Sequence, residues 1–199
     1  MLRQNWHRLL THLLSLAPLA MLLFDFFLDN LGANPLRRAM LRTGEVGLIL
    51  LVASFACTPL AALSGWRPIT QLRRALGLYG FLYIVLHFLI YAWLENDLRL
   101  DLILRDLGER RAMSVGMIAL ALLIPLAITS TKGWQRRLGK SWRRLHWLVY
   151  LAVPLSVLHF YLLDRDFKGE PLIYAGVVGL LLLIRLPRLL RTASSIHAR

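Results

Sequence analysis

Six long apolar stretches, separated by charged connectors, dominate this chain of 199 residues. A helix needs about 20 predominantly apolar residues to cross a bilayer. Hydrophobic residues make up 57% of the chain, which exceeds the share of about 45–50% in ordinary soluble domains. No stretch alternates with the period of two that a β-barrel requires. The sequence therefore predicts an all-α integral membrane protein, a bundle of six helices at about 9–28, 46–63, 76–94, 113–128, 145–163 and 172–186.

We interpret residues 1–199 as a single transmembrane domain, because neither a soluble region, a low-complexity linker nor an internal repeat is evident. The last stretch has only 13 uncharged residues before Arg185. We expect Arg185 and Arg188 to extend to the membrane interface and so lengthen this span. The single cysteine, Cys57, rules out a disulfide within the chain and a cysteine-based zinc site.

The charged residues predict which side of the membrane each connector occupies. The amino terminus, the second and fourth connectors and the carboxyl tail hold 15 of the 24 Lys and Arg residues and none of the 11 acidic residues. Lys and Arg are enriched in cytoplasmic loops. We therefore expect both termini in the cytoplasm, and we expect the third and fifth helices to run in parallel from the cytoplasm outward. This topology accounts for the net charge of +13, so we predict no nucleic-acid partner.

Three histidines lie in the third and fifth spans, namely His87, His146 and His159. Polar residues inside a membrane are costly and are candidates for function, and neutral imidazole is a common axial ligand of haem iron. His159 precedes Asp164 by five residues and His87 precedes Glu95 by eight. At about 1.5 Å per residue they lie about 8 and 12 Å below the outer charged layer. This similar depth predicts that His87 and His159 face each other across one haem. The alternative is that these histidines only hydrogen-bond neighbouring helices.

A second haem is less well supported by the pattern. His146 lies at the cytoplasmic edge of the fifth span, and at its level the third helix offers Arg73 and Arg74 rather than a histidine. Thirteen residues separate His146 from His159, which places them about 140° apart around an ideal helix. Pro154 lies between them, and we expect it to kink the helix. An arginine here could hold a propionate or a phosphate bidentately, and we expect Arg73 to face the bundle more directly than Arg74.

A cluster of basic residues with two interleaved tryptophans fills residues 132–144. Positive loops with aromatic belts are common at the cytoplasmic face of membrane proteins. The same composition could also dock a phosphate-bearing flavin or an acidic reductase. The sequence contains no GxGxxG, Walker, HExxH or Ser/His/Asp pattern.

Several segments resemble the MsrQ family, formerly called YedZ, in the superfamily of ferric reductases and NADPH oxidases. They are RRALGLYGFLYIVLH, which ends at His87, TSTKGWQRRLGKSWRRLHWLVYL, which contains His146, the later His159, and the short motifs GANP at 32–35, TPL at 58–60 and PLIYAG at 171–176. The resemblance runs from about residue 30 to residue 190, and its motifs occur in the same order.

The resemblance implies a haem-binding subunit in the bacterial inner membrane that serves methionine sulfoxide reduction. Haem b and FMN are the implied cofactors. A cytosolic flavin reductase or a membrane quinol is the implied electron donor, and a periplasmic MsrP-like molybdoenzyme is the implied acceptor. By resemblance, His87, His146 and His159 are the haem-ligand positions. The oxidases of the superfamily carry two histidines on the third helix, whereas this chain has Arg73 and Arg74 in place of the first.

Two other functions compete with electron transfer. In a proton-coupled transporter the histidines would relay protons, but the spans show no paired acidic residues at mid-membrane depth and no evident repeat of broken helices. A non-catalytic membrane scaffold for a partner enzyme is the third interpretation. The visible spectrum of the purified protein separates these alternatives, because only the first predicts a reduced b-type haem band.

Overall fold

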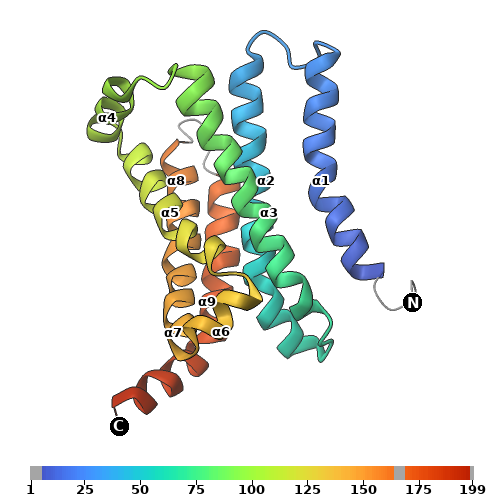
Figure 1. Cartoon of the computed structure of the whole chain (residues 1–199), viewed down its shortest axis with the longest axis vertical. Helices are drawn as coiled ribbons and strands as arrows, with labels where there is room; N and C mark the ends of the chain where they lie inside the picture. Colours follow the sequence, from blue (N-terminus) through green and yellow to red (C-terminus); the bar gives the residue numbers. More distant parts are fainter. Residues whose placement is uncertain (1–5, 164–168, 198–199) are drawn as a thin grey trace.

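The computed structural model describes residues 6–163 and 169–197, with side chains up to Leu186, and within these residues it contains helices and turns but no strand (Figure 1). Asp164 and Asp166, which the charge count assigned to the outer side, lie outside the described residues. The elements are α1 (Trp6–Phe27), α2 (Pro35–Ser64), α3 (Ile69–Leu89) with a π-helical turn (Ile90–Glu95), α4 (Leu100–Glu109), α5 (Arg111–Ile128), α6 (Lys132–Leu138), α7 (Lys140–Leu145), a 3₁₀ turn (His146–Leu148), α8 (Val149–Leu163) and α9 (Gly169–His197).

Six of the described helical segments are long and apolar enough to cross a membrane, which confirms the predicted six-helix bundle. The helix α2 is longer than the predicted 46–63, because it begins at Pro35. The side chain of Asn34 accepts a hydrogen bond from the Arg37 N–H, and proline is favoured in the first helical turn. The helix ends at Ser64 and is capped by Gly65, whose φ of 70° suits a residue without a side chain. The prediction missed the charged first turns of α2, because it followed hydropathy alone.

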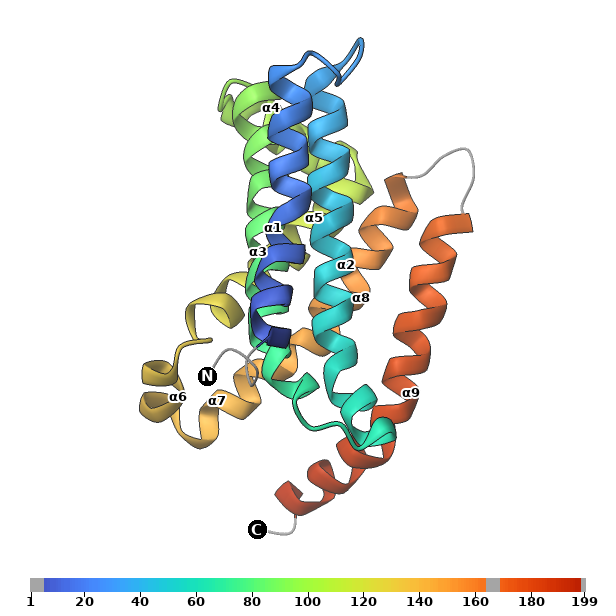
Figure 2. The same cartoon turned by 90° about the vertical axis from the view of Figure 1, so that its right-hand side faces the viewer.

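The six spans stand side by side, and α3 and α8 run in the same direction (Figure 1). The helix α1 begins, and α9 ends, at the same end of the bundle (Figures 1 and 2). Two helix pairs form the centre: α2 packs on α3, and α5 packs on α8. A Cβ at Gly47 would lie 3.3 Å from the Gly80 carbonyl oxygen, so glycine allows α2 and α3 to approach closely. Ala119 and Ala152 are buried in the second pair.

These two pairs are related by an internal repeat, so the expectation of no repeat is wrong. The sequence Val-Leu-His-Phe occurs at 85–88 on α3 and again at 157–160 on α8, a shift of 72 residues. The same shift relates Gly47 and Gly80 to the buried Ala119 and Ala152. The remaining positions of the two pairs differ enough that the repeat is inconspicuous in the sequence. The bundle is therefore built around two similar hairpins, each of which carries one histidine of the Val-Leu-His-Phe motif.

The tyrosine Tyr83 fixes α1 to α3 through a buried hydroxyl group. Its hydroxyl donates to the Ser15 carbonyl at 2.8 Å and accepts from the Leu19 N–H at 2.9 Å. These two groups would otherwise form one rung of the α1 hydrogen-bond ladder. A side chain inserted into the ladder is a known cause of helix bending, and Pro18 lies in the same turn.

The guanidinium of Arg185 lies inside the bundle, so the expectation that it extends to the membrane interface is wrong. The residue is only 5% exposed. It donates to the Phe55 carbonyl and to the Tyr150 hydroxyl, the latter at 3.2 Å. Its charged carbon lies 4.1 Å from the centre of the Phe55 ring. A carbonyl, a hydroxyl and aromatic faces thus surround a charge that we expected at the membrane interface. The side chain of Arg188 lies outside the described residues.

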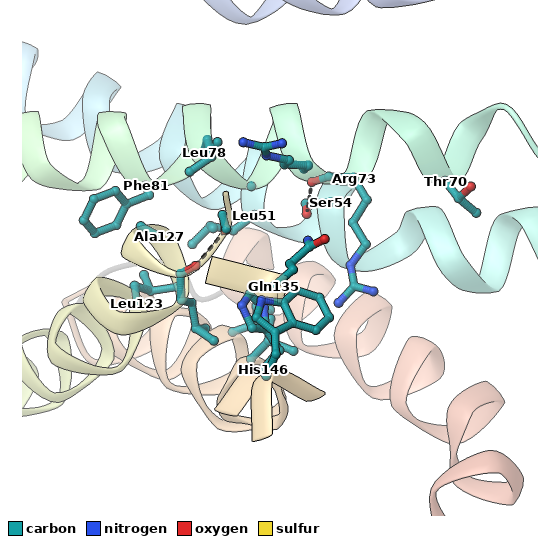
Figure 3. A pocket seen from close by; sticks show the side chains of 17 residues that line it. Leu51, Ser54, Thr70, Arg73, Leu78, Phe81, Leu123, Ala127, Gln135 and His146 are labelled. Carbon is teal, nitrogen blue, oxygen red and sulfur yellow. Dashed lines mark hydrogen bonds between the residues drawn. The ribbon is translucent and has the colours of Figure 1, made fainter. Parts of the chain in front are cut away.

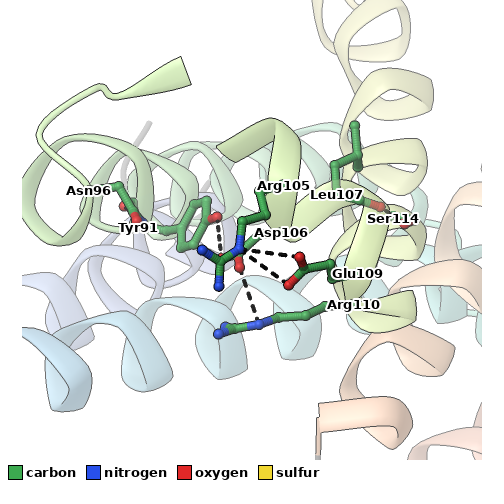
Figure 4. Close-up of polar contacts among 8 residues, drawn as sticks. All are labelled: Tyr91, Asn96, Arg105, Asp106, Leu107, Glu109, Arg110 and Ser114. Carbon is green, nitrogen blue, oxygen red and sulfur yellow. Dashed lines mark hydrogen bonds and ion pairs between the residues drawn. The ribbon is translucent and has the colours of Figure 1, made fainter. Parts of the chain in front are cut away.

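The short helix α4 joins α3 to α5 and was predicted only as a connector. Figure 4 shows the polar contacts that hold it in place. The Tyr91 hydroxyl, in the π-helical turn, donates to Asp106 at 2.9 Å. Arg110 pairs with the same carboxylate at 3.2 Å. The Ser114 hydroxyl donates to the Leu107 carbonyl at 2.6 Å and so closes the turn between α4 and α5.

Candidate cofactor site between α3 and α8

The structure brings His87 and His159 together, as their matched depths predicted. Their ring centroids lie 6.2 Å apart, and the ring planes are inclined by 82°. One ring comes from α3 and the other from α8. Both residues are half-buried between the two hairpins of the repeat.

Hydrogen bonds determine which ring nitrogen of each histidine carries the proton. The Nδ1 atom of His87 lies 2.8 Å from the Met40 carbonyl oxygen, and that of His159 lies 2.7 Å from the Ala112 carbonyl oxygen. A carbonyl can only accept, so each Nδ1 must be the donor. In a neutral imidazole the other nitrogen, Nε2, is then unprotonated and can bind a metal. A carbonyl partner of this kind is the usual support behind a metal-binding histidine.

The residues around the two rings fit a haem better than a bare metal ion. Neither Nε2 atom has a hydrogen-bond partner among the described residues. A ring nitrogen binds a metal at about 2 Å, so a centroid separation of 6.2 Å leaves room for one metal between the rings. Within the described residues no group of three or more His, Cys, Asp or Glu side chains could hold an ion. A haem needs only axial ligands from the protein, so two histidines are sufficient.

The third histidine, His146, has a different environment. Its Nε2 lies 3.1 Å from the Thr129 hydroxyl, which itself donates to the Pro125 carbonyl at 2.6 Å. The hydroxyl has one hydrogen, so it accepts from His146, and Nε2 is here the protonated nitrogen. The His146 ring also stacks on Trp142, with centroids 4.0 Å apart. Unlike His87 and His159, His146 does not present a free Nε2.

His146 begins the 3₁₀ turn His146–Leu148, which lies between α7 and α8. Pro154, at which we expected a kink, lies inside α8. The internal repeat gives the position of His146 a counterpart on α3, 72 residues earlier, and that counterpart is Arg74. The α3 side of the bundle thus offers no histidine opposite His146.

A cavity of about 230 Å³ separates α3 from the 3₁₀ turn at this level. Both predicted arginines, Arg73 and Arg74, line it together with His146 (Figure 3). The side chain of Arg73 extends toward the side of the cavity where His146 lies (Figure 3). Gln135 and Ser54 add polar groups, and the Ser54 hydroxyl donates to the Arg73 carbonyl at 2.7 Å. The cavity therefore combines positive charge with an apolar wall, which suits a planar group that bears an anion.

Sequence reasoning missed the residues that support the histidines. Gly44 contacts the His87 ring and Gly116 contacts the His159 ring. Each glycine precedes its histidine by 43 residues, and this equal spacing was a signal in the sequence. Thr129 and Trp142, which hold His146, gave no comparable signal.

Known proteins similar to this chain confirm the resemblance on which the sequence analysis relied. The profile of the ferric reductase-like transmembrane component family matches residues 43–157, a range that includes His87 and His146 and ends two residues before His159. A protein of Rhodospirillum rubrum named protein-methionine-sulfoxide reductase heme-binding subunit MsrQ is 44% identical over 92% of this chain and 89% of its own length. The chain belongs to the MsrQ family.

Other MsrQ proteins agree with this assignment. The MsrQ of Caulobacter vibrioides is 41% identical over 89% of this chain and 85% of its own length. The MsrQ of Xanthomonas campestris pv. campestris is 42% identical over 86% and 81% respectively. No solved structure matches the chain significantly.

Proposed function

We propose that this protein binds haem b between His87 and His159 and carries electrons across the membrane in a methionine sulfoxide reductase system. The observation that carries the proposal is the adjacent pair of imidazoles, each with its Nδ1–H bonded to a backbone carbonyl and its Nε2 without a hydrogen-bond partner among the described residues. The names of the MsrQ relatives, which call them heme-binding subunits of such a system, support it.

When bound, haem supplies reversible one-electron chemistry, and the residues of the chain hold and insulate it. The two imidazoles, one from each hairpin, bind its iron, and the carbonyls behind them fix the ring orientation. Val157, next but one to His159 in the chain, belongs to a buried apolar cluster that joins α2, α8 and α9. We further propose that the protein uses FMN as a cofactor. Its electron donor would be a cytosolic flavin reductase or a membrane quinol, and its acceptor a periplasmic MsrP-like molybdoenzyme.

We also infer that residues 1–199 form a single ferric reductase-like transmembrane domain in the bacterial inner membrane, with both termini in the cytoplasm. The matched region extends from α2 to α8, and α1 and α9 flank it. The segregation of acidic residues supports the orientation.

The haem assignment is tested by the variants His87→Ala and His159→Ala. Each should lose most of the low-spin b-type absorbance while the protein still inserts into the membrane. His12→Ala is the matched control, because the Nδ1 atom of His12 bonds the exposed Tyr79 hydroxyl at 2.9 Å and lies outside the site. A normal haem spectrum in both site variants would refute the assignment.

A second cofactor site is proposed in the inner cavity, for FMN or for a second haem. Two arginines on α3 support it, because the planar guanidinium holds an anionic oxygen group well. His146 would be a ligand or a close contact of the bound group. The haem and flavin content of the variants Arg73→Ala, Arg74→Ala and His146→Ala tests this proposal. Loss in the arginine variants supports an anion contact, and unchanged content in all three would leave only the outer haem.

A further inference from the structure

The two hairpins position their histidines by the same local arrangement of a backbone carbonyl and a glycine. The carbonyl of Met40 accepts from His87, and the carbonyl of Ala112 accepts from His159. In both hairpins this carbonyl lies 47 residues before the histidine, and a glycine follows the carbonyl by four residues. These glycines are Gly44 and Gly116.

Helix geometry explains why a glycine stands at this place. In an α-helix the carbonyl of residue i accepts from the N–H of residue i+4, so the carbonyls of Met40 and Ala112 belong to the rungs closed by Gly44 and Gly116. A side chain at i+4 would cover the carbonyl on the side from which a second donor approaches. Without a Cβ, the imidazole can approach the helix closely with its Nδ1 and reach an oxygen that already accepts a backbone hydrogen bond.

The space between each glycine and its ring leaves no room for a methyl group. A Cβ at Gly44 would lie 2.9 Å from Nδ1 of His87 and 3.1 Å from its Cε1. A Cβ at Gly116 would lie 2.6 Å from Nδ1 of His159 and 2.7 Å from its Cε1. Each contact is shorter than ordinary van der Waals distance, and each includes the nitrogen that donates to the carbonyl. An added methyl group would therefore displace the ring and lengthen that hydrogen bond.

We propose that Gly44 and Gly116 are positioning residues for the haem ligands, because they admit each imidazole to the carbonyl that fixes its Nδ1–H tautomer and aims its Nε2 between α3 and α8. This inference rests on the proposed haem site. It assigns a role to α2 and α5, which contribute no ligand of their own. It also explains why the two rings, on different helices, have equivalent supports.

Haem titration of the apoprotein gives the first test, with the variants Gly44→Ala and Gly116→Ala. Substitution of groups that orient metal-binding histidines typically lowers metal affinity by about 10–100-fold, and we expect a loss in this range. The loss should be larger for Gly116→Ala, whose contact is closer. The remaining bound haem should show weakened low-spin character, and added imidazole should restore it. Gly176→Ala and Gly179→Ala are the controls, because a Cβ at either position in α9 meets no atom within 4 Å.

A double-mutant cycle on the apoprotein separates this role from a general packing defect. Alanine is a better helix former than glycine, so Gly44→Ala should be harmless or stabilising once the ring is removed. We expect Gly44→Ala to lower the unfolding midpoint in the presence of His87 and to leave it unchanged or raised in the His87→Ala background. Gly116→Ala and His159→Ala should behave in the same way.

The two proposals fail in different ways. If His87→Ala and His159→Ala retain haem, the proposed haem site is wrong. The double-mutant cycle would still show whether each glycine contacts the ring of its histidine. If those variants lose haem but Gly44→Ala and Gly116→Ala bind it with unchanged affinity and spectrum, the positioning role is wrong and the haem site stands. An equal loss of stability with and without the ring would also overturn the positioning role.

Discussion

The substitution Tyr83→Phe tests how firmly α1 is attached to the bundle. Tyr83 is only 1% exposed, and its hydroxyl makes two hydrogen bonds to α1, to the Leu19 N–H and the Ser15 carbonyl. Hydrogen bonds between membrane helices average about 0.6 kcal/mol in double-mutant cycles, so the loss of two costs about 1.2 kcal/mol. If α1 cannot close its own ladder, a buried backbone group remains unpaired and the cost rises to about 3 kcal/mol.

Equilibrium unfolding in mixed micelles with increasing SDS measures this loss, and hydrogen exchange at the Leu19 amide shows whether it is local to α1. Tyr79→Phe is a matched control on the same helix, since the Tyr79 hydroxyl makes a single exposed hydrogen bond to His12. The control should cost about 0.6 kcal/mol or less. Equal effects of the two substitutions, with unchanged exchange at Leu19, would show that the inserted hydroxyl does not hold α1.

Two further predictions concern the buried arginine and the topology. Arg185→Lys should lower the free energy of unfolding by about 1–3 kcal/mol, because the Phe55 carbonyl and the Tyr150 hydroxyl bond two different nitrogens of the planar guanidinium, whereas a lysine has a single nitrogen. Arg185→Met should cost less than Arg185→Lys, because no buried charge remains, and the reverse order in the same unfolding assay would contradict this account. Reporter fusions at Asp101 should be active outside the cytoplasm, and fusions at either terminus should be active inside. A cytoplasmic signal from Asp101 would reverse the proposed orientation.

The sequence was sufficient to predict the membrane spans and to predict that His87 and His159 lie close together. Membrane helices are determined by length and hydropathy, and the depth of a histidine follows from its distance to the nearest charged connector. Depth alone brought His87 to the level of His159, and their rings are adjacent in the structure.

Features that depend on the neighbours of a side chain could not be predicted in this way. Arg185 was expected at the membrane interface. The sequence does not show that the Phe55 carbonyl and the rings of Phe55 and Tyr150 lie beside its guanidinium in the bundle. The hydrogen bond from His146 to Thr129 joins residues on different helices. The spacing of 43 residues from Gly44 to His87 and from Gly116 to His159 was visible in the sequence. Its meaning became clear only from the structure, in which each glycine contacts the ring of its histidine.

The division of the bundle into two similar hairpins has a consequence for biosynthesis. The first hairpin, with His87, is synthesised 72 residues before His159 emerges. A group held by both rings can therefore be captured only late, after α8 has entered the membrane. Once bound, such a group would link His87 to His159 and so act as a removable cross-link between the two hairpins. In the chain, the two hairpins are joined only through the π-helical turn and α4. Depletion of haem during growth should then yield a protein whose hairpins are each inserted but separate from one another more easily.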